Sequence, residues 1–353
     1  MNRPPLQEIR LRDFRCFPSI EWKLDAPATC ITGANAQGKT SLLEAVCVLL
    51  RLQSPRTTST SDLVRVGTPG FGLQGLWQDH SMAVRQDGDG RRLTLESKPG
   101  VRSSDYLALA RVTWFSNSDQ ELVVGGGSTR RRYLDFLGVQ TIPAYRKCLR
   151  DYERALRSRN LLLKDNRPRR EVAGFDTPLV ENGNVLMQER TRLVEALRPH
   201  AAFAASWIGG NNESLSIDYQ PGAAGAFPDA LEASRAEEER LRQTVCGPHR
   251  DDIGIFLNGL PAGSFASEGQ QRTIALSLKI AQARHIESST GQPPLLLLDD
   301  IFGELDPGRR NRLLGALPPE SQSILATTFL DWIEPDFPMR VWTLSGGGLR
   351  SLS

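Results

Sequence analysis

The stretch 28–50, ATCITGANAQGKTSLLEAVCVLL, constrains the fold of this chain more than any other. It predicts a short strand, a tight loop and a helix, and the loop fits the P-loop pattern G-x-x-x-x-G-K-[ST]. Glycines allow backbone angles and close approaches that a Cβ would block, so successive N–H groups can form a nest for phosphate. The helix that follows adds the positive end of its dipole. A chance match is the alternative, and the strand before and the helix after the loop argue against it.

Within this loop, Lys39 is expected to neutralise the β- and γ-phosphates of a nucleotide, and Thr40 to offer its hydroxyl to Mg²⁺. The predicted nucleotide contacts are Gly33, Ala34, Asn35, Ala36, Gln37, Gly38, Lys39 and Thr40.

Composition narrows the class of protein. The 353 residues suffice for two or three domains, or for one large domain with an insertion. The net charge of +2 does not by itself indicate a nucleic-acid partner. The cysteines are odd in number and form no C-x-x-C pair, which predicts neither a disulfide framework nor a zinc site and fits a cytoplasmic location. No signal-peptide core and no apolar run near the ~20 residues of a membrane span are visible, so no membrane association is expected.

Hydrophobic patterns predict β structure on both sides of the P-loop. Residues 6–17 and 19–24 resemble a hairpin, and short strand-like runs follow at 71–77, 82–85 and 92–96. A further strand is expected at 111–115, with a loop at 116–127. Within the P-loop helix, Leu42, Leu43, Val46 and Leu50 are expected to be buried.

From 130 to 170 the chain is strongly basic. It holds 13 Lys or Arg and four Asp or Glu there, a balance of +9 that leaves −7 for the rest. A helix is expected to bury Tyr145, Cys148, Leu149, Tyr152, Leu156 and Leu163. Another face of that helix carries Arg146, Arg150, Arg154 and Arg157. Such a stripe is typical of phosphate contacts with nucleic acid, and a solvated helix face is the alternative.

A second long helix is predicted to complete an αα-hairpin. Thr177 is the expected N-cap and Pro178 the first helical residue, and the helix is expected to end near Leu197. Residues 209–230 are rich in Gly, Ala and Pro, and 231–242 predict a short charged helix. The polar turn 244–252 suggests a structural or interfacial role rather than a metal site, because no second cluster has matching spacing.

Two later segments carry chemistry. Ser267 is a natural N-cap with Gln270 at the third position of an amphipathic helix, which indicates either capping alone or a helix N-terminus that binds phosphate. The run PLLLLDD predicts a buried parallel strand that ends in Asp299 and Asp300. Carboxylates at that end of a strand, in a chain with a P-loop, suit Mg²⁺ binding and the positioning of water. Residues 323–328 predict another buried strand.

The motifs in order resemble an ABC-type ATPase head of the SMC kind and, in finer wording, the bacterial RecF family of recombination mediators. The segments that carry this resemblance are GANAQGKTSLLEAV, TRRRYLDFLG, FDTPLVENGNVLMQER, CGPHRDDI, SEGQQRTIALSLKIA and LLLLDDIFGELD. The resemblance implies an α/β fold with a mixed sheet and an inserted α-helical arm domain. It implies domain limits of 1–115 and 245–353 for the ATPase lobe and 116–244 for the arm.

The resemblance also implies roles for single residues. Asp299 would be the Walker B acid that holds Mg²⁺ with Thr40, and Asp300 and Lys39 would be catalytic. Ser267, Gly269 and Gln270 would form the ABC signature, and 303–306 the D-loop. Two copies would dimerise around ATP, each nucleotide lying between one Walker A loop and the other copy's signature.

By the same resemblance, the chain is a weak ATPase that binds gapped DNA at single-strand to double-strand junctions and acts with RecR, RecO and RecA. The sequence departs from the family pattern at Glu268, Asn117 and Gln120, and Thr327 or Thr328 stands where a switch histidine occurs in related ATPases. These departures leave nucleotide binding intact and bear on hydrolysis and the response to DNA. Alternatives are a transport-coupled ABC subunit, a P-loop kinase and a DNA clamp that binds ATP without hydrolysing it.

Overall fold

The computed structural model describes residues 4–210, 213–303, 305–330 and 339–352, which form two compact units. The first unit joins Met1–Ser118 to Ile286–Ser353, and the second is Asp119–His285. The second boundary lies later in the chain than the predicted limit at 244/245. The reason is an antiparallel pairing between Leu215–Gln220 and Asp252–Leu257, which joins segments on both sides of that limit.

The first unit contains a mixed six-stranded sheet in the order β15-β14-β3-β13-β12-β8. Its strands are β3 (Ala28–Thr32), β8 (Val112–Ser116), β12 (Leu295–Asp299), β13 (Ser323–Thr327), β14 (Arg340–Ser345) and β15 (Gly348–Leu352). All neighbours pair in parallel except β15, which returns antiparallel along β14. The four leucines of β12 are buried, as expected for a parallel strand covered on both faces. The predicted strands at 111–115 and 323–328 are therefore confirmed, and so is the strand through the four leucines, which ends at Asp299 with Asp300 just beyond it.

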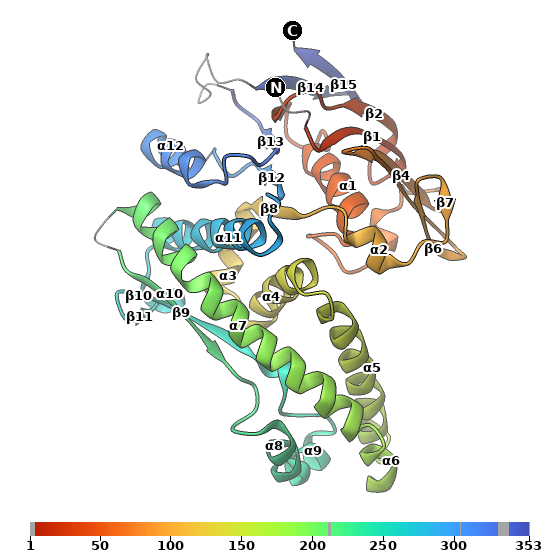
Figure 1. Cartoon of the computed structure of the whole chain (residues 1–353), viewed down its shortest axis with the longest axis vertical. Coiled ribbons are helices and arrows are strands. Elements are labelled where there is room, and N and C mark those ends of the chain that lie inside the picture. The colour runs from red at the N-terminus through yellow and green to blue at the C-terminus, as the bar shows by residue number, and fades with distance from the viewer. Residues whose placement is uncertain (1–3, 211–212, 304, 331–338, 353) are drawn as a thin grey trace. The chain divides into compact units, whose positions relative to one another are not determined.

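A second, antiparallel sheet of the same unit has the order β2-β1-β4-β5-β6-β7. It comprises β1 (Leu6–Phe14), β2 (Phe17–Lys23), β4 (Phe71–Trp77), β5 (His80–Asp87), β6 (Gly90–Leu95) and β7 (Lys98–Pro99). The predicted hairpin is confirmed, with Ile9 opposite Trp22. Helix α1 (Lys39–Arg51) contacts strands of both sheets (Figure 1), and its four predicted apolar residues are buried. Shorter helices complete this unit: η1 (Ser61–Leu63), α2 (Ser103–Leu107) and α12 (Pro307–Ala316).

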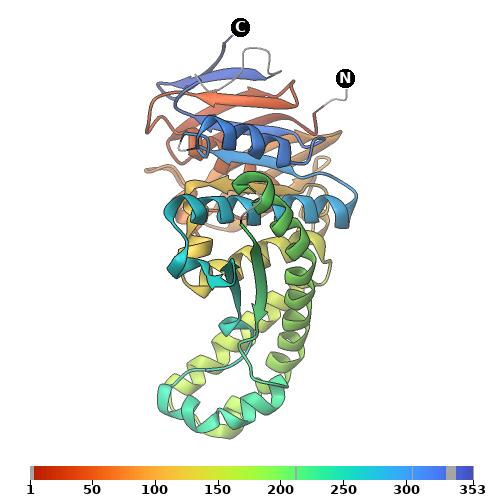
Figure 2. The same ribbon diagram turned by 90° about the vertical axis from the view of Figure 1, so that its left-hand side faces the viewer.

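The second unit is mainly helical. Helices α5 (Tyr145–Lys164) and α7 (Asp176–Gly209) lie side by side as the predicted αα-hairpin, and α6 (Arg169–Ala173) connects them (Figures 1 and 2). A three-stranded sheet, β11-β10-β9, packs near α4 and α7. The remaining elements are α3 (Glu121–Val124), α4 (Gly127–Thr141), β9 (Leu215–Gln220), α8 (Phe227–Ala233), α9 (Arg235–Leu241), η3 (Pro248–Arg250), β10 (Asp252–Leu257), β11 (Leu260–Pro261) and α10 (Ala262–Phe265). The division between the units falls within η2 (Asn117–Gln120) and within α11 (Glu268–Thr290).

Several local predictions for this unit were wrong. Helix α7 starts at Asp176 rather than after a Thr177 cap, and it continues through Pro199 to Gly209 instead of ending near Leu197. Proline removes one helical hydrogen bond, but Ala201, Ala204, Ala205 and Ile208 beyond it are buried and α7 packs against β9, so tertiary contacts outweigh the local preference. The expected loop 116–127 contains η2 and α3, and 231–242 forms parts of two helices. Among the described helices, none is both long and apolar enough to cross a membrane.

Candidate nucleotide-binding site

The P-loop connects β3 to α1, and two of its glycines occupy positions where a side chain would collide. Gly33 has a φ of 155°, and a Cβ there would lie 2.4 Å from the carbonyl oxygen of Leu344. Gly38 has a φ of 99°, and a Cβ there would lie 2.6 Å from the Phe17 ring. The fixed glycines of the pattern are thus explained by the packing of this loop against the sheet.

The side chain of Lys39 folds back onto the start of the P-loop. Its Nζ donates hydrogen bonds to the carbonyl oxygens of Gly33, at 2.6 Å, and Ala34, at 3.0 Å. Burial lowers the pKa of Lys39, while the charges of Asp300 and Asp299 act in the opposite direction. The ammonium group is thus held against the loop backbone, where phosphate oxygens bound by the loop would meet it.

The two predicted Mg²⁺ ligands are in direct contact. Thr40 Oγ1 donates a hydrogen bond of 2.8 Å to Asp299 Oδ1, although 259 positions separate these residues. Strand β13 lies between β3 and β12, so the end of β12 faces the start of α1. Burial raises the pKa of Asp299 to about 6, with a further contribution from the charge of Asp300. The hydroxyl and the carboxylate are hard oxygen donors of the kind that Mg²⁺ accepts beside phosphates, and a cation would offset the burial of Asp299.

Asp300 follows β12 in a left-handed conformation, with a φ of 53°. The side-chain amide of Asn117 donates a hydrogen bond of 3.3 Å to the backbone carbonyl of Asp300. Asn117 is one of the departures from the family pattern, and a proline in its place could not make this contact. Thr327, one of the two candidates for the position of a switch histidine, is buried at the end of β13, and its hydroxyl donates to the Phe329 carbonyl.

The sequence reasoning missed a charged cluster beside the loop. Glu44, fully buried in α1, accepts two hydrogen bonds from Arg15, at 2.8 and 2.7 Å, and one from Arg56, at 3.1 Å. Arg56 also lowers the pKa of Asp299, so its charge acts on the strand-end carboxylate. In the sequence, the one sign of this cluster was a glutamate, Glu44, among the apolar residues of the P-loop helix. A buried carboxylate there requires cationic partners.

The signature segment forms the predicted capping box at the start of α11. Gln270 Oε1 accepts from the Ser267 backbone N–H at 2.9 Å, and Ser267 Oγ accepts from the Gln270 N–H at 3.4 Å. Ser267 is exposed, and Glu268 extends into solvent near Arg272. Phosphate binding at this helix start stays a prediction. The predicted D-loop contains Glu304, which lies outside the described residues.

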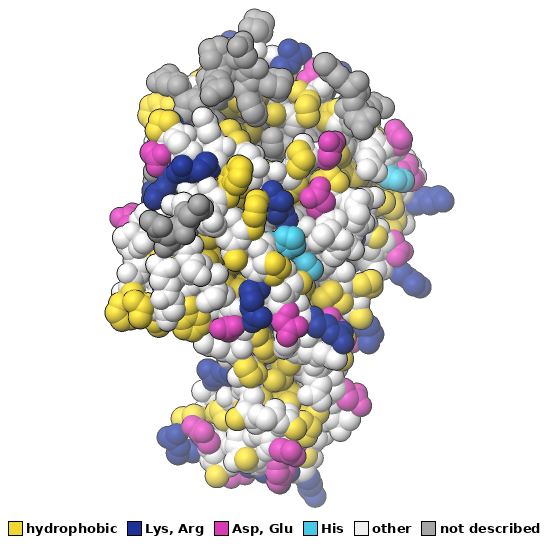
Figure 3. Space-filling view, turned by 60° about the vertical axis from the view of Figure 1, so that its left-hand side comes forward, with side chains coloured by type: hydrophobic (Ala, Val, Ile, Leu, Met, Phe, Trp, Pro, Cys, Tyr) yellow, Lys and Arg dark blue, Asp and Glu magenta, His cyan; other side chains and the backbone are white. Residues whose placement is uncertain are grey.

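Fewer arginines of the basic stretch 130–170 are available to a ligand than its composition suggested, because some are buried or paired with acidic side chains. Arg130 forms a bidentate pair with Asp252, at 2.6 and 2.9 Å, and Arg159 is completely buried on the inner face of α5. The exposed arginines of the predicted stripe are Arg150, Arg154 and Arg157. Figure 3 brings forward the side that lies on the left in Figure 1, and basic and acidic side chains are interspersed on that face; α5 lies on the right in Figure 1.

The turn 244–252, for which a structural or interfacial role was expected, is held by hydrogen bonds within the second unit. Asp251 is fully buried and accepts hydrogen bonds from Arg190, from Tyr219 and from the Gly222 backbone. Burial lowers the pKa of His249 to about 4, which keeps its ring neutral beside Tyr152. No group of potential metal-binding side chains occurs in the described part of the chain.

Comparisons with known proteins agree with this geometry. A family model described as an AAA domain matches residues 8–121. The DNA replication and repair protein RecF of Gloeothece citriformis (strain PCC 7424) is 35% identical, with 98% of this chain and 99% of the relative covered. RecF of Rippkaea orientalis (strain PCC 8801 / RF-1) is 36% identical, with 92% and 93% covered.

Solved structures extend the comparison to the fold. The recombination mediator protein RecF with ATPrS, in the RecFOR pathway, superposes with a TM-score of 0.90 and 28% identity over 99% of both chains. An Smc head bound to the C-winged helix domain of ScpA has a TM-score of 0.58 at 16% identity, covering 99% and 98%, and shares the fold alone. The predicted α/β ATPase head of the ABC and SMC kind is thereby confirmed. The chain belongs to the RecF family of DNA replication and repair proteins.

Proposed function

We propose that this chain binds ATP with Mg²⁺ at the P-loop and uses the nucleotide to control its own dimerisation on DNA during recombinational repair and replication. The observation that carries the proposal is the 2.8 Å hydrogen bond between Thr40 and Asp299 beside the Lys39 ammonium. It brings the two oxygen ligands and the cation of a nucleotide site together from distant parts of the chain. Solved RecF structures with ATP and ATPrS support the choice of nucleotide.

In this proposal, the loop N–H groups of 33–40 and the Lys39 ammonium hold the β- and γ-phosphates. Thr40 and Asp299 would hold Mg²⁺, which supplies positive charge against the phosphate oxygens when it is bound. Asp300 accepts a hydrogen bond from a water molecule and orients it toward the γ-phosphorus. The water oxygen bonds to phosphorus, the bond to the ADP oxygen breaks, and the products are ADP and phosphate.

The same residues lead us to propose slow turnover. Asp300 is one methylene shorter than the glutamate usual in transport-type ABC heads, and a displacement of about 1 Å can cost on the order of a hundredfold in rate. Slow hydrolysis suits a timed switch better than a motor.

The second half of each nucleotide site would come from another copy of the chain. Ser267, Gly269 and Gln270 stand at an exposed helix start, and the dipole of a 23-residue helix favours an anion there. A γ-phosphate held by one copy would join the two subunits through this helix start.

The exposed arginines Arg150, Arg154 and Arg157 are our candidates for contacts with DNA phosphates. Gapped DNA, RecR with RecO, and RecA are the proposed partners, and family membership is the support for them.

Sedimentation with and without ATP and duplex DNA tests the proposal. Wild-type protein should be monomeric without ATP, dimeric with ATP, and bound to DNA as the dimer. Ser267→Arg should still bind ATP but stay monomeric, because the added side chain and charge occupy the place of the γ-phosphate. An unchanged dimer fraction in this variant would contradict the proposed arrangement. Dimerisation on DNA without phosphate release would instead favour a clamp that does not hydrolyse ATP.

A further inference from the structure

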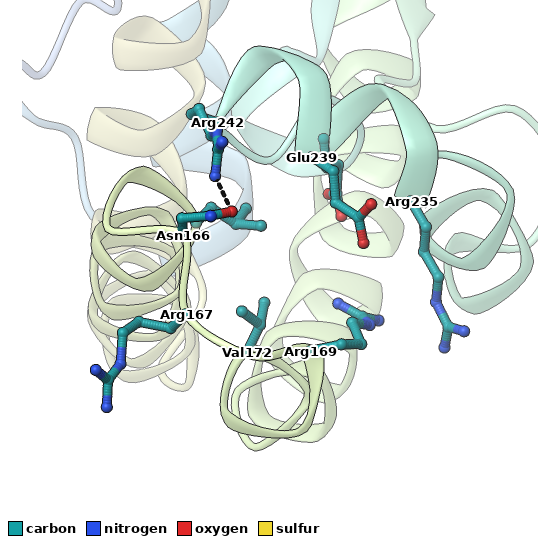
Figure 4. Close-up of a pocket in the computed structure, with 9 residues that line it drawn as sticks. Asn166, Arg167, Arg169, Val172, Arg235, Glu239 and Arg242 are labelled. Carbon is teal, nitrogen blue, oxygen red and sulfur yellow. Dashed lines mark hydrogen bonds between the residues drawn. The ribbon is translucent and has the colours of Figure 1, made fainter.

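The end of the αα-hairpin in the second unit contains a pocket that the nucleotide site does not explain. It has a volume of about 250 Å³ and is lined by the end of α5, the turn that follows it, α6 and α9 (Figure 4). Its lining includes four arginines, Arg167, Arg169, Arg235 and Arg242, and two glutamates, Glu238 and Glu239. The two contributing segments are far apart in sequence, so no motif indicated this site.

A buried ion network fixes the walls of the pocket. Arg159 donates to Asp176 at 2.9 Å and to both oxygens of Glu238, at 2.8 and 2.7 Å, which links α5, α7 and α9. A further hydrogen bond of 2.8 Å reaches Thr244. Both oxygens of Glu238 are thus occupied within the protein, so this carboxylate does not neutralise the pocket.

The other arginines that line the pocket differ in whether a carboxylate of the protein already pairs with them. Arg167 pairs with Glu171 at 2.9 Å and is directed away from the pocket in Figure 4, and Arg235 pairs with Glu232. By contrast, Arg242 is directed across the pocket to Asn166, a neutral partner, and no described carboxylate pairs with it (Figure 4).

Two further features point to a ligand with both an acceptor and a donor. Arg169 binds Asp176 through one terminal nitrogen, at 2.8 Å, while its Nε is buried and has no acceptor among the described residues. Glu239 is exposed at the rim, and no described cation pairs with it. The pocket therefore offers unmatched N–H donors next to one unmatched carboxylate.

The pocket lies on a different face from the arginine stripe. Leu163, which lines it, shares the inner face of α5 with Tyr145, Tyr152 and Arg159, whereas Arg154 lies about half a turn away. A duplex that follows the stripe would therefore run along the opposite side of the helix.

We infer that this pocket anchors an acidic side chain from an extended segment of a partner protein. Guanidinium groups bind carboxylates in a planar, bidentate way, and arginine-lined pockets are typical anchor points of protein interfaces. The volume is below the roughly 300–1,000 Å³ of small-molecule sites, so it suits a side chain better than a whole nucleotide. A peptide backbone N–H beside the acidic side chain would give Glu239 its donor, which a phosphate dianion lacks.

Fluorescence anisotropy of the full chain with a labelled decapeptide of alternating Asp and Ala tests this inference. The wild type should bind this peptide and not the matched peptide with Asn in place of Asp. Arg242→Gln should weaken binding about tenfold, the loss expected from one charge-assisted hydrogen bond. The control is Arg192→Gln, which removes one exposed arginine of α7 and should leave peptide affinity within about twofold.

Arg242→Gln should have the same melting temperature as the wild type and should still dimerise with ATP. The pocket is then tested separately from the nucleotide site. If this variant does not fold, Arg242→Lys takes its place, because lysine keeps the charge but cannot form the planar bidentate pair, and it should also weaken binding. The inference is overturned if the peptide does not bind, or if Arg242→Gln and Arg192→Gln have equal effects. It is also overturned if only a 5′-phosphorylated oligodeoxynucleotide depends on Arg242.

Discussion

Asp299→Asn should make the nucleotide-free protein more stable while it removes Mg²⁺-ATP binding. Burial raises the pKa of Asp299 from 3.8 to about 6, so folding holds this carboxylate in an environment that disfavours its charge. One pKa unit corresponds to about 1.4 kcal/mol, which gives a cost of about 3 kcal/mol at neutral pH, or about 2 kcal/mol with partial solvent screening. Asparagine can still accept the hydrogen bond from Thr40, so most of this cost should be recovered.

The sign of the pH dependence follows from the raised pKa. Above pH 6, Asp299 is ionised in both states and the folded protein carries the full cost. As the pH falls through 6 toward 3.8, the folded protein takes up a proton first and the cost disappears. The stability advantage of Asp299→Asn should therefore be greatest at pH 7–8 and roughly half as large at pH 5.

Urea unfolding followed by tryptophan fluorescence measures this difference. Four of the six tryptophans, Trp22, Trp77, Trp114 and Trp342, lie in the described part of the first unit, and Trp207 lies in the second. Asp25→Asn is the matched control, because Asp25 is exposed in an ion pair with Arg340 and its removal should change stability by less than about 1 kcal/mol. If Asp299→Asn is no more stable than wild type at pH 7.5, or if its advantage does not shrink at pH 5, the carboxylate does not carry the cost we assign to it.

Three further predictions concern ATP and DNA. Lys39→Ala should lose a charge-assisted contact with phosphate worth roughly 1.5–3 kcal/mol, measured as weaker ATP binding by calorimetry, and unaltered affinity would contradict its role. Asp300→Asn should bind ATP but release phosphate far more slowly and leave DNA later after an ATP chase; a wild-type rate would exclude Asp300 as the group that orients water. Reversing Arg150, Arg154 and Arg157 to Glu should weaken binding to all DNA sequences alike and flatten the slope of log K against log salt, which would be near −4 if about four phosphates are neutralised. An unchanged slope would mean that these arginines form a solvated face.

The sequence by itself determined the local features of the nucleotide site. The P-loop, the capping box at Ser267 and Gln270, and the buried β12 with its terminal acids could all be predicted. Each depends on backbone conformation or hydrophobic periodicity within a few residues, and such signals remain readable without knowledge of the fold. The order of the motifs likewise indicated the family.

Tertiary structure alone decided which distant groups meet and which charges are free. The contact between Thr40 and Asp299 spans 259 positions and exists because β12 lies in the same parallel sheet as β3, the strand that leads into α1, with only β13 between them. The charge count of 130–170 could not reveal that Arg159 is buried in an ion network, because burial depends on what α7 and α9 bring to α5. Packing against β9 likewise carries α7 past Pro199, and residues of α5, α6 and α9 with the turns beside them form the pocket around Arg242. The physical reason is that the energies of burial and ion pairing arise between elements that only the folded chain brings together.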